Sequence, residues 1–164
     1  MIYVIGAGYM AREYLKVIKQ MELGAKVVSV SKNSADYITN EFGFYCSQGG
    51  FASLNGFADT GDIAVVCTPV ETLYDCTKHL IAIGFKKILV EKPGALNLDD
   101  LRELKELAHN SCCEVFIAYN RRFFASVEHV RRVLETEELV AVNFELSEWT
   151  HLINQGDYNE DVLK

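Results

Sequence analysis

The sequence predicts an α/β protein built on a doubly wound parallel sheet, and three observations support this fold class. Short apolar runs rich in β-branched residues alternate with longer stretches of helical period, which is typical of repeated βαβ units. The runs are apolar at nearly every position, as burial on both faces of a parallel sheet requires. The 164 residues, 49% apolar and 24% charged, have the composition of an ordinary globular protein. We expect one full domain.

Six of the apolar runs are predicted to be the strands of this sheet. In chain order, they span residues 2–5, 26–30, 44–46, 63–67, 87–90 and 114–118.

A helix is predicted directly after the first strand, over residues 8–21. Apolar side chains recur on one face of it, and Gly24 would supply a left-handed stop beyond its end. The side chains expected on the buried face are Met10, Tyr14, Val17, Ile18 and Met21.

A second well-defined helix is predicted from Asn97, which is a favourable N-cap residue. Asp99 and Asp100 complement the positive end of the helix dipole. The side chains expected to be buried are Leu98, Leu101, Leu104 and Leu107.

The pattern changes after a further helix that carries Phe123 and Leu134. Apolar and polar residues alternate over 140–146, which indicates a strand with one polar face, as in antiparallel sheets. Such a strand needs a cover for its apolar face, so we expect it to dock on a neighbouring chain in a homo-oligomer or to extend the sheet. The polar stretch 154–164 is expected to be partly disordered.

Charge and hydropathy exclude several classes of partner. The net charge is −7 and basic residues occur at most in pairs, so nucleic acid is not an expected partner. No apolar run reaches the roughly 20 residues that a bilayer crossing needs. The N-terminus lacks the pattern of a signal peptide, so the sequence predicts a cytoplasmic protein.

The cysteines and histidines show no spacing typical of a metal site. Five cysteines, at 46, 67, 76, 112 and 113, form no CxxC pair, and the histidines at 79, 109, 129 and 151 form no ligand pattern with them. We therefore expect reduced, mostly buried thiols and no metal.

The segment that joins the first strand to the first helix reads Gly6-Ala7-Gly8-Tyr9-Met10-Ala11, a GxGxxA pattern. The first glycine permits a tight turn, the second lets a diphosphate approach the backbone, and Ala11 allows close packing of helix and strand. The pattern and its strand-turn-helix context predict a dinucleotide-binding Rossmann fold with contacts from residues 6–10. The alternative is an ordinary turn between strand and helix.

The end of the second strand bears on which dinucleotide is bound. An acidic residue there would bond the adenosine ribose of NAD and repel a 2′-phosphate. Ser31, Lys32 and Asn33 stand there instead, and the first carboxylate is Asp36. A hydroxyl, a cation and an amide can all donate to a phosphate, so the sequence predicts NADP(H) over NAD(H). The alternative is that Lys32 and Asn33 form only a solvated turn.

A lysine closes the fifth strand, in the run Glu91-Lys92-Pro93. Ligands of open α/β sheets lie beyond the carboxyl ends of the strands, so Lys92 would project toward the reactive end of the cofactor. A lysine there can donate a proton to a substrate oxygen or accept one from it. By its spacing alone, Lys92 would be interpreted as a surface residue before a turn.

Four motifs in order give the chain a more specific likeness. With the glycine loop, Cys67-Thr68-Pro69, Glu91-Lys92-Pro93 and Tyr119-Asn120-Arg121-Arg122, it resembles the glucose-fructose oxidoreductase, inositol dehydrogenase and rhizopine-catabolism family (Gfo/Idh/MocA). The resemblance implies a nicotinamide-dependent oxidoreductase of carbohydrate metabolism, acting on a sugar, sugar nucleotide or cyclitol.

The resemblance also implies roles for single residues. Thr68 and Pro69 would line the cofactor groove, Glu91 would contact the nicotinamide ribose, and Lys92 would be the catalytic acid/base. The Lys92–Pro93 bond would be cis. The residues implied to border the nicotinamide and substrate are Tyr119, Asn120 and Arg121 or Arg122.

The chain departs from the family in its length. Members usually carry a second domain that completes the catalytic set, so the resemblance implies a dinucleotide-binding domain over 1–136 and the start of a truncated C-terminal α/β substrate domain over 137–164. Where many members have a histidine after Thr-Pro, this sequence has Leu73. We expect the chain alone to bind cofactor without efficient turnover. The alternative is a non-catalytic sensor or interaction protein that binds NAD(P).

Overall fold

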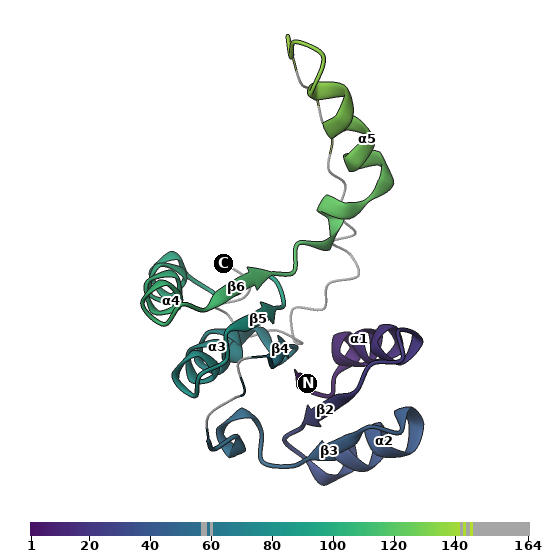
Figure 1. Ribbon diagram of the computed structural model, residues 1–164, viewed down its shortest axis with the longest axis vertical. Coiled ribbons are helices and arrows are strands. Elements are labelled where there is room, and N and C mark those ends of the chain that lie inside the picture. The colour runs from purple at the N-terminus through teal and green to yellow at the C-terminus, as the bar shows by residue number, and fades with distance from the viewer. Residues whose placement is uncertain (57–58, 60, 142, 144, 146–164) are drawn as a thin grey trace. The chain divides into compact units, whose positions relative to one another are not determined.

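The computed structural model describes residues 1–56, 59, 61–141, 143 and 145, and it divides into two compact units, Met1–Ala118 and Tyr119–Lys164. The first unit contains a six-stranded sheet in which every neighbouring pair of strands is parallel, in the order β3-β2-β1-β4-β5-β6 (Figure 1). This confirms the predicted doubly wound fold. The strands are β1 Ile2–Ile5, β2 Ala25–Val28, β3 Tyr45–Ser47, β4 Ile63–Val66, β5 Lys87–Val90 and β6 Glu114–Ile117.

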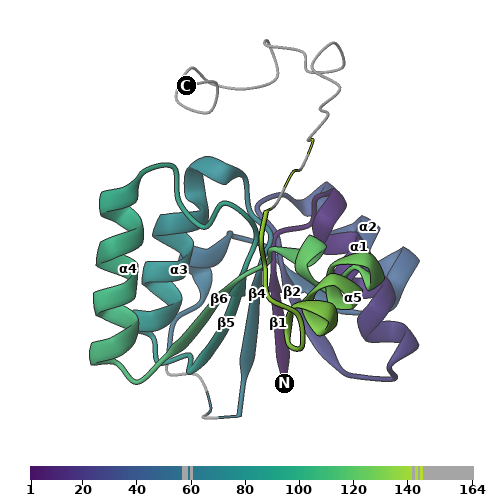
Figure 2. The same cartoon turned by 90° about the horizontal axis from the view of Figure 1, so that it is seen from above.

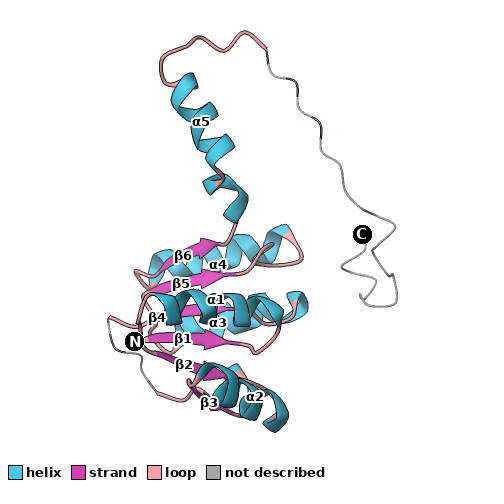
Figure 3. Ribbon diagram, turned by 90° about the vertical axis from the view of Figure 1, so that its right-hand side faces the viewer, coloured by secondary structure: helices cyan, strands magenta, loops and turns pink. Residues whose placement is uncertain are grey.

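Four helices cover the two faces of this sheet. Figure 2 shows α1 (Tyr9–Gln20) and α2 (Lys32–Phe42) on one side of the strands and α3 (Leu73–Ala82) and α4 (Leu98–Asn110) on the other. The chain winds outward from β1 through β2 to β3 and then crosses to β4 on the other side of β1, as Figure 3 shows. The order therefore reverses between β1 and β4, which is where open α/β sheets form their ligand crevice.

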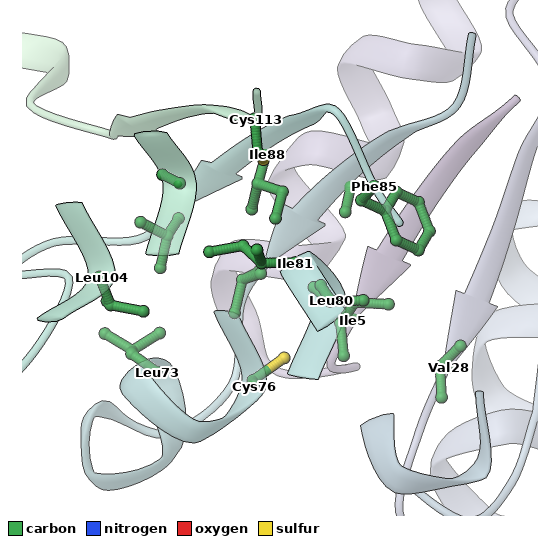
Figure 4. Close-up of a cluster of buried hydrophobic side chains, with 14 residues drawn as sticks. Ile5, Val28, Leu73, Cys76, Leu80, Ile81, Phe85, Ile88, Leu104 and Cys113 are labelled. Carbon is green, nitrogen blue, oxygen red and sulfur yellow. The ribbon is translucent and has the colours of Figure 1, made fainter. Parts of the chain in front are cut away.

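The sheet residues alternate between two hydrophobic cores because successive strand side chains point to opposite faces. Val4, Val27 and Val65 pack with Ala11, Leu15 and Ile18 of α1 on one face. Their neighbours Ile5, Val28 and Val66 pack on the other face with α3 and α4 (Figure 4). Burial of both faces explains why the strands are apolar at nearly every position.

The buried face of α1 matches the prediction in part: Ile18 is buried, and Met10 and Tyr14 are partly buried against the same core. Ala11, Leu15 and Ile18 are buried, whereas Val17 is 50% exposed and Met21 is 61% exposed. At 3.6 residues per turn, Val17 lies about 160° around the helix axis from Leu15. Fully buried Ala11 marks the face of the helix that packs on the sheet, so Val17 and Met21 were predicted on the wrong side of the helix.

The end of α1 was also predicted wrongly. The left-handed residue after the helix is Glu22, with φ 56°, and not Gly24. The amide of Glu22 donates to the Lys19 carbonyl at 3.1 Å, and that of Leu23 donates to the Ile18 carbonyl at 3.1 Å. These two bonds form a Schellman motif, which satisfies carbonyls that the helix leaves free.

The helix α4 begins as predicted, with the Asn97 side chain accepting a hydrogen bond from the Asp100 amide at 2.8 Å. Its buried residues are Leu104 and Ala108. Leu98 is 59% exposed because it lies about 120° around the axis from Leu104. Cys112, expected to be buried, is exposed, because it takes the left-handed position just after this helix, with φ 49°.

The second unit contains a short 3₁₀ turn, Asn120–Phe123, and α5 (Ala125–Leu134). All residues of α5 are exposed. The strand expected over 140–146 falls partly outside the described residues, and its described members, 140, 141, 143 and 145, have no strand assignment. The stretch 154–164 lies wholly outside the described part of the chain. The boundary expected after residue 136 stays a prediction.

Candidate functional site

The turn after β1 is shaped by Gly6, whose φ of 115° lies in the region that favours glycine. A Cβ built on Gly6 would overlap the carbonyl oxygen of Cys67 and lie 2.8 Å from its carbonyl carbon. The Gly6 amide donates to the Val28 carbonyl at 2.8 Å. Gly6 is therefore required by the packing of the protein itself.

Gly8, in contrast, faces open space. It is the N-cap of α1, has no side chain to cap the first turn, and a Cβ built on it would meet no atom within 4 Å. The amide groups at the start of a helix have no partner within the helix, and the helix dipole makes this end positive. A glycine that the fold does not require thus leaves a bare, positive surface at the start of α1, which suits an anion such as a diphosphate.

A cavity of about 740 Å³ opens at the carboxyl ends of β1, β2, β4 and β5, beside this turn. It brings together most of the residues that the sequence singled out. These are Gly6, Ala7, Gly8, Tyr9, Met10, Ser31, Thr68, Pro69, Glu91 and Lys92. Lys32 and Asn33 do not line it: they lie exposed in the first turn of α2. Tyr119, Asn120 and Arg122 belong to the second unit.

Thr68 is the one residue with a buried, unpartnered side-chain polar atom in the described part of the chain. Its hydroxyl oxygen is buried and has no hydrogen-bond partner among the described residues. A buried hydroxyl without a partner is unfavourable by about 1–3 kcal/mol. Because Thr68 lines the cavity, a polar ligand there would satisfy the hydroxyl. The bare helix start and this hydroxyl both fit a nicotinamide dinucleotide.

At the end of β2, Ser31 and Ser34 line the cavity. The Ser31 hydroxyl accepts from the Ser34 amide at 3.2 Å and donates to the Ser34 hydroxyl at 2.9 Å. Ser31 therefore caps α2, and the Ser34 hydroxyl keeps its own proton for another acceptor. Ser34 lines the cavity although the residues expected to contact the cofactor here ended at Asn33.

Arg12 is a second lining residue that the sequence analysis missed. Its Nε donates to the Ala7 carbonyl at 3.3 Å, and its guanidinium carbon lies 4.3 Å from the centre of the Tyr37 ring. No ion pair of Arg12 is found in the described part of the chain. One signal was available: Arg12 lies one helical turn after Gly8, so both lie on the same face of α1.

Glu91 and Lys92 follow β5 on the other side of the glycine loop. The Tyr14 hydroxyl donates to Oε1 of Glu91 at 2.9 Å. Burial, and then the hydrogen bond to Glu91, raise the pKa of Tyr14 well above its usual range, so its hydroxyl stays protonated. Lys92 is exposed, and the Lys92–Pro93 bond is cis, as the resemblance implied.

The cysteine beside the cavity is not activated. Burial, and secondarily the charge of Glu91, raise the pKa of Cys67 to about 12. The thiolate is the nucleophilic form of cysteine, so this thiol is inert at neutral pH. All five cysteines are free thiols.

The described residues contain no candidate metal centre and no candidate membrane-spanning helix. In that part of the chain, no group of three or more histidine, cysteine or acidic side chains could hold a metal ion. None of the described helices combines the length and the apolar character needed to span a membrane.

Comparisons with known proteins agree with this geometry. Two curated relatives are inositol 2-dehydrogenase of Rhizobium meliloti (strain 1021), 25% identical over 80% of this chain, and glucose-6-phosphate 3-dehydrogenase of Bacillus subtilis (strain 168), 27% identical over 84%. The match covers 39% of each relative, so the chain spans about two fifths of their length.

Solved structures share the fold. One is the WlbA dehydrogenase from Bordetella pertussis in complex with NADH and UDP-GlcNAcA, with a TM-score of 0.70 and 16% identity over 82% of this chain and 40% of that one. The model of the oxidoreductase family with an NAD-binding Rossmann fold, GFO_IDH_MocA, matches residues 1–119. A crevice at the carboxyl ends of the strands and a family match over most of the sequence lead to one conclusion: this chain belongs to the Gfo/Idh/MocA oxidoreductase family and contains its N-terminal NAD-binding domain.

Proposed function

We propose that this chain is the cofactor-binding part of an oxidoreductase that transfers hydride between a nicotinamide dinucleotide and a sugar, sugar nucleotide or cyclitol. The observation that carries the proposal is the bare start of α1 at Gly8, in the same cavity as the unpartnered Thr68 hydroxyl. The substrate class is supported by the relatives, which act on inositol and glucose 6-phosphate.

In this proposal, the role of each residue follows from the strand after which it lies. Residues 6–10 hold the diphosphate through main-chain amides, and Thr68 and Pro69 form the groove wall. The bound cofactor supplies the hydride chemistry. Lys92, exposed at the end of β5, donates a proton to the substrate oxygen or removes one as the reaction runs. Tyr119, Asn120 and Arg122 border the nicotinamide and substrate in this proposal.

The alternative function is a sensor that binds the nicotinamide pool without catalysis. The family is one of oxidoreductases, and the chain keeps the Glu91-Lys92-Pro93 run with Lys92 in the cavity wall. A sensor would have no need of a lysine at the reactive end of the cavity. The oxidoreductase is therefore the favoured function.

Direct titration tests the proposal. We expect the purified chain to bind NADPH and NADH, seen as quenching of protein fluorescence or by calorimetry, with NADPH bound more tightly. Turnover of a sugar substrate by the chain alone is expected to be inefficient. Absence of binding of either cofactor at millimolar concentration would remove the central claim.

We further propose that the cofactor is NADP(H) in preference to NAD(H). Among the residues that line the cavity near the end of β2, none is acidic, while the Arg12 guanidinium and the Ser34 hydroxyl can both donate to a phosphate. The guanidinium of Arg12 is held between the Ala7 carbonyl and the Tyr37 ring, so a bound phosphate would not have to order it.

Replacing Arg12 with methionine, which keeps an unbranched apolar stem and removes the guanidinium, is expected to weaken NADPH binding about tenfold to 100-fold and to leave NADH binding nearly unchanged. The reason is that a charge-assisted hydrogen bond contributes about 1.5–3 kcal/mol, and only NADPH carries the 2′-phosphate. The measurement is the ratio of the two dissociation constants at low and high salt. Lys32→Met is the matched control, because Lys32 does not line the cavity and should give a smaller change. Equal weakening of both cofactors by Arg12→Met would contradict this assignment.

A further inference from the structure

Tyr14 links two elements that lie far apart in the sequence. It stands on α1, and its hydroxyl donates to Oε1 of Glu91, 77 residues later at the end of β5, with an oxygen–oxygen distance of 2.9 Å. Both side chains are part-buried. Glu91 lines the cavity, whereas Tyr14 does not, so Tyr14 reaches the cavity only through the carboxylate.

The chemistry of the pair leaves one carboxylate oxygen for a ligand. The raised pKa of Tyr14, caused first by burial and then by the hydrogen bond, keeps the hydroxyl a donor, and its single proton is used on Oε1. No partner of Oε2 is found among the described residues. An ionised carboxylate accepts hydrogen bonds only, so Oε2 suits a ligand that presents a hydroxyl.

The position of Glu91 in the cavity indicates which hydroxyl group of a bound dinucleotide its Oε2 atom can reach. The strand order β2-β1-β4-β5 places the Arg12 and Ser31 end of the cavity on one side of the glycine loop and the Glu91 and Lys92 end on the other. A dinucleotide whose diphosphate lies at Gly8 would extend its adenosine half toward β2 and its nicotinamide half toward β5. The hydroxyls within reach of Glu91 are then those of the ribose on the nicotinamide side.

We propose that Tyr14 is a positioning residue, whose hydroxyl fixes the Glu91 carboxylate so that Oε2 can make the contact with the nicotinamide-side ribose that the family resemblance implies for Glu91. The inference rests on the proposed cofactor. A tyrosine that only tied α1 to the sheet would affect stability, and it would affect all ligands of the cavity alike. A positioning tyrosine affects only ligands that carry the second ribose.

The test is the substitution Tyr14→Phe, which removes one oxygen atom, measured with ADP, ADP-ribose and NADH by calorimetry. ADP ends at the diphosphate, ADP-ribose adds the second ribose, and NADH adds the nicotinamide. We expect ADP to bind equally to both proteins, and ADP-ribose and NADH to bind about tenfold more weakly to the variant, the scale of one hydrogen bond to a charged group. Tyr3→Phe is the matched control: Tyr3 packs edge-on against Phe85 in the core away from the cavity, and no hydrogen bond of its hydroxyl is found in the described residues.

A double-mutant cycle with Glu91→Ala separates positioning from other effects. In the Glu91→Ala background, Tyr14→Phe should cause no further loss of ADP-ribose affinity. An equal loss for ADP and ADP-ribose, no loss for either, or the same loss with and without Glu91 would overturn the inference. Failure of the proposed function gives a different result, since the unchanged protein would then bind none of the three ligands.

Discussion

The variant Gly8→Asp is expected to remain folded and to lose cofactor binding by at least about 100-fold. A side chain at Gly8 meets no protein atom within 4 Å, and its φ of −74° is accessible to any residue, so the fold tolerates the change. Asp is also a somewhat better N-cap than Gly, by a few tenths of a kcal/mol. The new carboxylate would occupy the amides at the start of α1 and repel the diphosphate, which explains the size of the loss.

Two measurements check this result: titration with NADPH, and unfolding by heat or denaturant. Gly61→Asp is the matched control, because Gly61 is also open to solvent and precedes β4, at the edge of the sheet opposite the cavity. It adds the same charge and should leave affinity unchanged. Normal NADPH binding by Gly8→Asp would show that no phosphate lies at the start of α1.

The variant Gly6→Ala is expected to lose stability as its primary effect, in contrast to Gly8→Asp, which stays folded and loses cofactor binding. The positive φ of Gly6 strains any L side chain, by about 1–3 kcal/mol. The added Cβ must also displace the backbone at Cys67, and such overpacking costs typically about 1–3 kcal/mol. Together they predict a free energy of unfolding lower by about 3 kcal/mol or more.

Urea or thermal unfolding of Gly6→Ala beside Gly8→Ala measures this difference. The two variants make the same chemical change two residues apart, and only the first meets the chain. A Gly6→Ala protein within about 1 kcal/mol of the unchanged protein would mean that the turn relaxes around the methyl group, against the expectation for a close-packed interior.

Features of the molecule that depend on local backbone requirements could be predicted from the sequence. The glycine loop is an example, because its turn, its helix start and its small packing residue Ala11 occupy fixed positions in the chain. The strands β1 and β5 begin and end at the expected residues, because each is a short, mostly apolar run that can be recognised within its own segment. The N-cap of α4 is a third local signal, since Asn97 bonds an amide only three residues away.

What the sequence could not show depends on how helices rotate and where they meet. Val17 and Met21 of α1 were wrongly expected on the buried face, because the helix rotates to place Ala11 on the sheet. Arg12 is held in the cavity wall by Tyr37 of α2. The sequence of α2 is mostly polar, so its pattern did not predict a helix there. The bond from Tyr14 to Glu91 exists only because α1 packs beside the end of β5, which no pattern within either segment reveals.

The left-handed turn after α4 has a practical consequence for following the protein in solution. It holds Cys112 exposed to solvent, whereas Cys67, Cys76 and Cys113 are buried and Cys46 is partly covered. The turn leads into the amino end of β6, and because all strands are parallel, this is the rim of the sheet remote from the cavity. A maleimide fluorophore attached to Cys112 would therefore report on tumbling or assembly without obstructing a nucleotide.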